Sequence, residues 1–282
     1  MPTLASGTDV EELARHVDRG GVLVVTGAGI STDSGIPDYR GPTGTLRNGL
    51  PMTYQEFVGS AEARQRYWAR SHLGWKRVAR ARPNISHEVV ADLEAEGRVL
   101  GVVTQNVDGL HTAAGSREVV DLHGRLDTVA CLGCGDRRPR LEIGLRLDVC
   151  NPGFGDGGSN DAATKPDGDV ALDDEAIAGF TVVDCRSCGG VLKPDVVFFG
   201  EHVPRERFRH ALGLLDRAAS LLVLGSSLTV GSGFRFVTAA TRRGLPVLIV
   251  NRGTTRGDHH ATLKIDGLLG DILPPLRPVE GA

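Results

Sequence analysis

The alternation of apolar and polar positions predicts buried strands with helices between them. Four short runs consist almost entirely of apolar, mostly branched residues, as is typical of parallel strands buried on both faces. They lie at residues 22–25, 99–104, 221–224 and 247–250. Segments with apolar residues at helical spacing occupy residues 9–19, 87–96, 205–218 and 233–243. This order of elements is typical of an α/β domain whose sheet is covered by helices.

Two regions interrupt this order. Residues 55–80 show a helical pattern and contain both tryptophans. Residues 131–188 hold all five cysteines and include a stretch, 151–169, that is rich in Gly, Asn and Asp and is predicted to be an irregular loop. We interpret both regions as insertions into the sheet domain rather than as a second domain in series.

Composition and charge narrow the class of protein. Of the 282 residues, 40% are hydrophobic and 24% are charged, which is ordinary for a globular protein. The net charge of −3 provides no basic surplus for nonspecific binding to nucleic acid or to an anionic membrane. No apolar run approaches the roughly 20 residues that span a bilayer, and the first residues lack the features of a signal peptide. We therefore expect a cytoplasmic protein that binds neither nucleic acid nor membrane, of unknown oligomeric state.

Two Cys-x-x-Cys pairs predict a zinc site. Cys131 and Cys134 form one pair, Cys185 and Cys188 form the other, and a glycine follows each pair. Four thiolates close a tetrahedral shell around Zn²⁺ and leave no position for water, so the zinc is expected to be structural. Four buried cysteines without metal, or a redox pair, are the alternatives, and the two matched copies favour the metal. The remaining Cys150 is expected to be a plain buried cysteine.

A glycine-containing loop follows the first predicted strand. Gly27 and Gly29 permit close approach of the backbone to a phosphate, and the next helix is expected to point its N-terminus at that charge. The pattern is weak by itself, because Thr32 stands where a dinucleotide fingerprint has its third glycine and no acidic residue follows about 20 positions later. An ordinary turn is the alternative. The continuation through residues 36–40 is more specific, and the forked donors of Arg40 suit phosphate or carbonyl oxygens.

Polar residues also follow the strand at 99–104. Gln105, Asn106 and Asp108 lie just beyond its end, so they are expected to face the same crevice as Gly27. Adjacent Asn and Asp side chains can bind an amide such as nicotinamide, although a turn that closes the strand is an alternative. His123 ends another short strand and has the side chain best suited to act as a base near neutral pH; a structural histidine is the other reading.

The ordered set of motifs resembles the sirtuin family over about residues 9–273. The motifs are Gly-Ala-Gly-Ile-Ser (27–31), Pro-Asp-Tyr-Arg (37–40), Thr-Gln-Asn-Val-Asp (104–108), Leu-His-Gly (122–124), the two cysteine pairs, Lys-Pro-Asp-Val-Val-Phe-Phe-Gly-Glu (193–201), Gly-Ser-Ser-Leu (225–228) and Val-Asn (250–251). Residues 37–40, residues 66–70 and the long interval between the cysteine pairs look most like the class II branch. That branch includes a mitochondrial sirtuin with lipoamidase and deacylase activities.

The resemblance implies an α/β fold with a Rossmann-like parallel sheet, an inserted small zinc-binding module and a helical insertion. We expect the NAD-binding domain at residues 1–124 and 191–282, with the helical insertion at about 50–80, and the zinc-binding module at 125–190. The implied activity is NAD-dependent removal of acyl groups from lysine side chains of proteins or peptides, giving nicotinamide and O-acyl-ADP-ribose. Transfer of ADP-ribose to protein by the same site is the alternative. A nicotinamide dehydrogenase and a non-enzymatic zinc-ribbon module fit the motifs less well.

The resemblance also implies roles for individual residues. His123 would be the general base, Asn106 and Asp108 would hold the nicotinamide carboxamide, and residues 196–200 would pair with the substrate peptide as an added strand. The implied NAD contacts are Gly27, Ala28, Gly29, Ser31, Ile36, Pro37, Asp38, Tyr39, Arg40, Gln105, Asn106, Val107, Asp108, Gly225, Ser226, Ser227, Asn251, Arg252, Gly253 and Leu269. Gly253 replaces an acidic residue of many sirtuins, and residues 41–47 differ from the common deacetylase pattern. These departures leave the adenosine contacts and the acyl specificity open.

Overall fold

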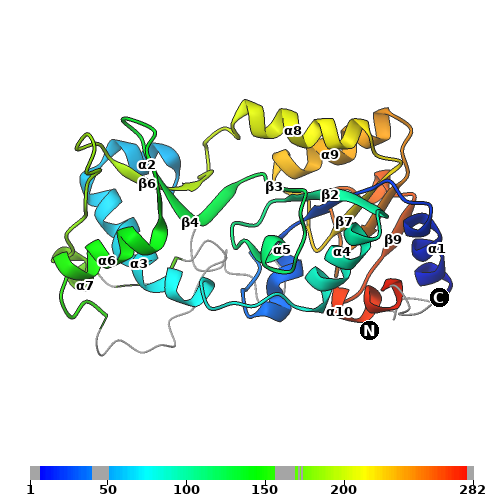
Figure 1. Ribbon diagram of the computed structural model, residues 1–282, viewed down its shortest axis with the longest axis horizontal. Helices are drawn as coiled ribbons and strands as arrows, with labels where there is room; N and C mark the ends of the chain where they lie inside the picture. The colour runs from blue at the N-terminus through cyan, green and yellow to red at the C-terminus, as the bar shows by residue number, and fades with distance from the viewer. Residues whose placement is uncertain (1–6, 40–50, 156–168, 171, 173, 278–282) are drawn as a thin grey trace.

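A six-stranded parallel sheet forms the larger part of the molecule in the computed structural model, which describes residues 7–39, 51–155, 169–170, 172 and 174–277 (Figure 1). The spatial order of its strands is β3-β2-β1-β7-β8-β9. Their bounds are β1 Val22–Thr26, β2 Val99–Thr104, β3 Val119–Asp121, β7 Ser220–Leu224, β8 Val247–Val250 and β9 Leu263–Ile265. β1 is entirely buried, as its unbroken apolar sequence predicts.

Helices cover both faces of this sheet because successive strand residues point to opposite sides. Val22 and Val24 of β1 belong to one core with α1 (Gly7–Asp18), α4 (Ile85–Ala95), α10 (Leu269–Ile272) and the short helix η4 (Pro274–Leu276). Leu23 and Val25 belong to a second core with α8 (Arg205–Asp216) and α9 (Gly231–Arg242). Figure 1 shows α8 and α9 along one side of the sheet and α4 and α10 along the other. The α/β fold with a Rossmann-like parallel sheet is confirmed.

A smaller antiparallel sheet lies at the other end of the elongated molecule (Figure 1). It has the order β5-β4-β6, with β4 Gly124–Cys131, β5 Arg137–Pro139 and β6 Leu192–Val196. The helical insertion forms α2 (Tyr54–Gly59) and α3 (Ala61–Val78), and the interval between the cysteine pairs contributes α6 (Arg140–Cys150) and α7 (Asp174–Ala178). Phe57, Trp68, Val129 and Ile143 from these elements share one core, so the two insertions pack together as a unit.

Several features of the two sheets and their helices were not predicted. These features are the helix α6, the pairing of β4 with β5 and β6, and the edge strand β9. Their sequences show no strong periodic pattern of apolar residues, because the elements are short or expose much of their surface. β6 pairs with β4 rather than with the large sheet, although we had grouped its residues with the NAD-binding domain. The predicted domain boundaries stay a prediction.

The prediction that Cys150 is buried is wrong, because its side chain is exposed. The inward face of α6 carries Arg140, Ile143 and Leu147, which are all buried. Asn151 continues this face four residues after Leu147 and is itself buried, which turns Cys150 outward.

The loop predicted at 151–169 is described only at its ends, and residues 156–168 lie outside the described residues. Across the described part of the chain, no helix combines the length and apolar character needed to cross a membrane.

Candidate active site and zinc centre

A cavity of about 1560 Å³ lies between the large sheet, β6 and the helices α8 and α9. The segments that follow β1, β2, β7 and β8 all line it, as expected for a ligand site at the carboxyl edge of a parallel sheet. A typical small-molecule pocket measures about 300–1,000 Å³. The cavity therefore has room for a dinucleotide and part of a second substrate.

The loop after β1 is pressed against the loop after β7. The Gly29 amide donates to the Gly225 carbonyl at 2.8 Å. A Cβ at Gly27 would lie 2.7 Å from the Ser226 Cβ, and one at Gly29 would lie 2.8 Å from the Gly225 oxygen, so both positions require glycine. The helix expected after the glycines is a short 3-10 helix, Ala28–Ser34. Its first turn and the bare glycine backbone form part of the cavity wall, which suits close approach of a phosphate.

The polar residues after β2 form one hydrogen-bonded cluster with this loop. Asn106 Nδ2 donates to the Gly27 carbonyl and to Ser31 Oγ, both at 3.1 Å. Ser31 Oγ donates to Asp108 Oδ2 at 2.8 Å, and the other Asp108 oxygen accepts from the Leu110 amide at 2.9 Å. Burial raises the pKa of Asp108, while these donors favour its ionised form. The cluster fixes an amide and a carboxyl group in the wall of the cavity.

His123 lies in the same wall with both ring nitrogens engaged. Nδ1 is 3.0 Å from the Gln105 carbonyl, which can only accept, so the proton of the neutral ring is on Nδ1. Nε2 is then the basic nitrogen, and it accepts from the Ser232 hydroxyl at 2.7 Å. Burial lowers the pKa of His123 to about 4, and the Gln105 contact acts in the opposite direction. The ring is therefore neutral at pH 7 and able to accept a proton at Nε2.

The segment after β6 offers free backbone groups to the cavity. The Val197 amide donates to the His123 carbonyl at 2.7 Å, and the Phe199 carbonyl accepts from the Tyr54 amide at 2.9 Å. Phe199 thereby forms an isolated parallel bridge with Thr53, and among the described residues no hydrogen bond engages the Val197 carbonyl. Buried Lys193 donates to Glu201 Oε2 at 3.0 Å, and the same oxygen accepts from the Phe198 amide, which fixes the segment. Such an edge can pair with an extended peptide.

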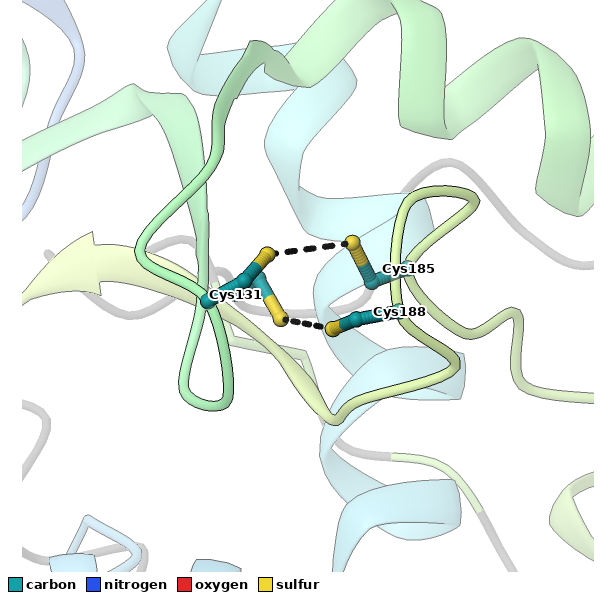
Figure 2. A group of neighbouring side chains, drawn as sticks. Cys131, Cys185 and Cys188 are labelled. Atoms are coloured by element: carbon teal, nitrogen blue, oxygen red, sulfur yellow. Dashed lines mark hydrogen bonds between the residues drawn. The ribbon is translucent and has the colours of Figure 1, made fainter.

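The two cysteine turns face each other across a gap that fits a zinc ion (Figure 2). The ligand atoms of Cys131, Cys134, Cys185 and Cys188 all lie within 4.8 Å of one another. The Sγ atoms of Cys131 and Cys188 are 3.5 Å apart, and those of Cys134 and Cys185 are 3.8 Å apart. Tetrahedral zinc with Zn–S bonds of about 2.3 Å requires about 3.8 Å between sulfurs. These four residues are positioned to bind a structural zinc.

Most of the implied NAD contacts meet in the cavity. Its lining includes Gly27, Ala28, Gly29, Ser31, Ile36, Asp38, Tyr39, Gln105, Asn106, Val107, Asp108, Gly225, Ser226, Ser227, Asn251, Arg252 and Gly253, together with His123. Arg40 lies outside the described residues, and Pro37 is absent from the lining. Leu269 is buried in the core beneath the sheet rather than in the cavity wall. The role of each residue in NAD binding stays a prediction.

Three features of the cavity escaped the sequence analysis. Ser232 contacts His123 across 109 positions of sequence. Arg70, which lies in the segment 66–70 that resembles the class II branch, forms an ion pair of 2.8 Å with Asp169 in the cavity wall. Asp266 Oδ1 accepts from the Gly253 amide at 2.9 Å, which brings a carboxylate beside the position where the expected acidic residue is missing. None of these pairings has a local sequence signal, because the partners come from distant elements.

Comparisons with known proteins agree with this geometry. The Sir2 family model matches residues 27–232. The chain is 57% identical over 266 residues to NAD-dependent protein deacetylase 1 of Streptomyces coelicolor, covering 94% of this chain and 88% of the relative. It is 52% identical over 261 residues to NAD-dependent protein deacetylase of Xanthomonas campestris, covering 93% and 87%.

Solved structures give the same result. A structure described under the mechanism and regulation of Sir2 enzymes superposes with a TM-score of 0.75 at 30% identity, covering 96% of this chain and 97% of that one. A Sir2 structure with p53 peptide and NAD⁺ gives a TM-score of 0.72 at 30% identity, covering 95% and 96%. With the parallel sheet, the cavity at its carboxyl edge and the four-cysteine cluster, these matches show that the chain belongs to the Sir2, or sirtuin, family.

Proposed function

We propose that this protein is an NAD-dependent protein-lysine deacylase that uses NAD as co-substrate and releases nicotinamide. The observation that carries the proposal is the neutral His123, whose basic Nε2 lies in the same cavity as the glycine loop and a free peptide-binding edge. Relatives that cover most of the chain are named NAD-dependent protein deacetylases, which supports acetyl-lysine as one substrate.

The residues around the cavity fit NAD. The backbone at Gly27 and Gly29, with Ser226 opposite, would hold the phosphates, and Asn251 would hold a ribose hydroxyl. Asn106 and Asp108 would hold the nicotinamide carboxamide. Bound NAD supplies an electrophilic ribose carbon with a neutral leaving group, and the acyl oxygen of the substrate is the nucleophile.

His123 then serves as the base. Its Nε2 accepts a proton from a ribose hydroxyl once the Ser232 hydroxyl gives way, while Nδ1 keeps its proton on the Gln105 carbonyl. The peptide edge at residues 197–199 orients the acyl-lysine, and the cavity wall excludes water that would compete with the acyl oxygen. After the acyl oxygen has bonded to the ribose carbon, one water molecule is consumed as the lysine amine leaves, and the products are the free lysine, nicotinamide and O-acyl-ADP-ribose.

The proposal also specifies which acyl groups the enzyme removes. The resemblance to the class II branch predicts lipoyl and other larger acyl groups in addition to acetyl. The cavity volume of about 1560 Å³ supports this breadth, because room remains beside a dinucleotide. Tyr67, Met52 and the Arg70–Asp169 ion pair line the cavity near this space and offer both apolar and charged contacts.

Incubation of the full chain with NAD and a panel of acetyl-, lipoyl- and longer acyl-lysine peptides tests the function. We expect nicotinamide release that depends on the acyl peptide, with O-acyl-ADP-ribose and free lysine identified by mass. ADP-ribosylated protein without O-acyl-ADP-ribose would instead support the transferase alternative. Formation of NADH, or no nicotinamide with any peptide, would contradict the proposal.

A further inference from the structure

One face of α8 and the first turns of α9 form a patch with an apolar floor and a basic rim. Arg205, Phe208, Arg209 and Leu212 follow the helical spacing of three and four residues, and all four line the cavity. Arg235 of α9 lines the same region, with its guanidinium 5.6 Å from the Phe208 ring centroid. Phe208 and Leu212 are half-buried, whereas the three arginines are exposed. We call these five residues the α8–α9 patch.

The three arginines have no acidic partner in the described part of the chain. Among the described residues, no ion pair involves Arg205, Arg209 or Arg235, although Arg207 between them pairs with Asp195. The described acidic groups of the cavity wall are engaged elsewhere, and Glu201, which precedes α8, holds Lys193. The patch therefore carries three positive charges that pair with no described carboxylate, on a protein whose net charge is −3.

The patch is continuous with the proposed reaction site. Arg235 is three residues along α9 from Ser232, which contacts the basic nitrogen of His123 at 2.7 Å. The peptide edge at residues 197–199 leads into α8, which begins at Arg205. A peptide that extends along this edge past its acyl-lysine would therefore run toward the basic rim.

We propose that the α8–α9 patch selects substrates with acidic residues on one flank of the acylated lysine. This inference rests on the proposed deacylase function and specifies the class of protein it acts on. The aliphatic and aromatic floor accepts the stem of a flanking side chain, and the arginines bind its carboxylates with forked donors. Because these contacts lie on the rim, they act through binding and depend on salt.

The test compares peptides that carry the same acyl-lysine with acidic, neutral or basic residues, placed on either the N-terminal or the C-terminal flank. For one of the two flanks, we expect the peptide with acidic residues to have a kcat/KM about tenfold above that of the peptide with basic residues at low salt. The difference should arise mainly from a lower KM and should become smaller at high salt. Equal kcat/KM for acidic, neutral and basic peptides on both flanks would overturn the inference, while the proposed function would stand. Turnover of no peptide at all would overturn the proposed function itself.

Charge-reversal variants test whether the preference for acidic peptides arises from the α8–α9 patch. The double variant Arg209→Glu with Arg235→Glu should remove the preference for acidic peptides or turn it toward basic ones. The matched control, Arg217→Glu with Arg242→Glu, makes the same charge change on exposed residues at the C-terminal ends of the same two helices, outside the cavity, and should keep the preference. Thermal unfolding checks that both fold. An unchanged preference in the patch variant, or a higher KM for NAD as its only effect, would contradict the inference.

Discussion

His123 is held between two hydrogen bonds that determine which nitrogen can act. The carbonyl of Gln105 fixes the proton on Nδ1, and the Ser232 hydroxyl occupies Nε2 until substrate arrives. The histidine was identified from its place at the end of a strand, and its role follows from the family resemblance. The tautomer depends on the Gln105 carbonyl after β2, and the Ser232 contact depends on α9, which is more than a hundred residues away. Neither contact could be predicted from the local sequence.

His123→Ala should lower turnover by roughly 10²–10⁴, because the general base is lost while the binding loops remain. Steady-state nicotinamide release measures the loss, and thermal unfolding should show a midpoint close to that of the parent. If the variant kept a turnover within a few-fold of that of the parent, His123 would not be the general base.

Ser232→Ala should move the acid limb of the kcat/KM profile to higher pH. Burial lowers the pKa of His123 to about 4. Because a hydroxyl that donates to Nε2 favours the neutral ring, we expect the Ser232 contact to lower this pKa further. Activity needs the neutral ring and is lost as pH falls through this pKa, so a higher pKa brings the loss at a higher pH. Thr238→Ala removes another α9 hydroxyl, bonded to the Arg235 carbonyl, and should leave the profile in place. Coincident profiles for Ser232→Ala and the parent would show that the contact has no influence.

At the scale of elements, the strands of the large sheet were predictable because each is a short apolar run buried on both sides. The helices followed from spacing, with ends within about two residues for α1, α4, α8 and α9. Helix α6 and the antiparallel strands were missed, since α6 exposes Leu141, Leu145 and Val149 and β5 is wholly exposed. Helix α6 packs against β4 and β5, and its buried residues share a core with residues of α3 and β4, so its position depends on these contacts rather than on an amphipathic pattern of its own.

The start of α9 is fitted to the loop after β2, which predicts a specific effect of Gly233→Ala. A Cβ there would lie 2.4 Å from Gln105 Nε2, so the Gln105 side chain must move and lose its hydrogen bond of 3.2 Å to Ser226 Oγ in the cavity wall. We expect roughly a tenfold fall in kcat/KM for NAD with the fold retained.

Gly213→Ala is the matched control, because a Cβ in the middle of α8 meets nothing within 4 Å. It should stabilise the protein by about 0.5–1 kcal/mol through helix propensity, with activity unchanged. Activity in Gly233→Ala equal to that of the control would show that the loop tolerates the added methyl group.

At the scale of the whole molecule, the zinc module and the helical insertion share one core, and β4 joins that core to the reaction site. β4 runs from Gly124, next to His123, to the zinc residue Cys131. The hydrogen bond between the His123 carbonyl and the Val197 amide links the same strand pair at its other end. Metal binding is therefore expected to support the active site without touching it.

Cys131→Ser should lose zinc, lower the unfolding midpoint and reduce activity, since the metal contributes folding energy to the small sheet. Cys150→Ser is the matched control, because Cys150 is exposed and outside the four-cysteine cluster. Metal analysis should find one zinc per chain in the parent and the control. Parent-like stability of Cys131→Ser with no bound metal would contradict a structural role.

The α/β class, the four cysteines of the zinc site and many residues of the cavity wall could be predicted from the order of residues alone. These features have local signatures: unbroken apolar runs, paired thiolates in tight turns, and glycine or polar residues directly after strands. Four other features became apparent only in the folded molecule: Ser232 contacts His123, Cys150 faces solvent, the two insertions share a core, and three arginines without a described acidic partner border the cavity. Each of these features depends on which distant elements pack together. Packing is determined by the surfaces of both elements, and the sequence of one segment does not show which other segment it will meet.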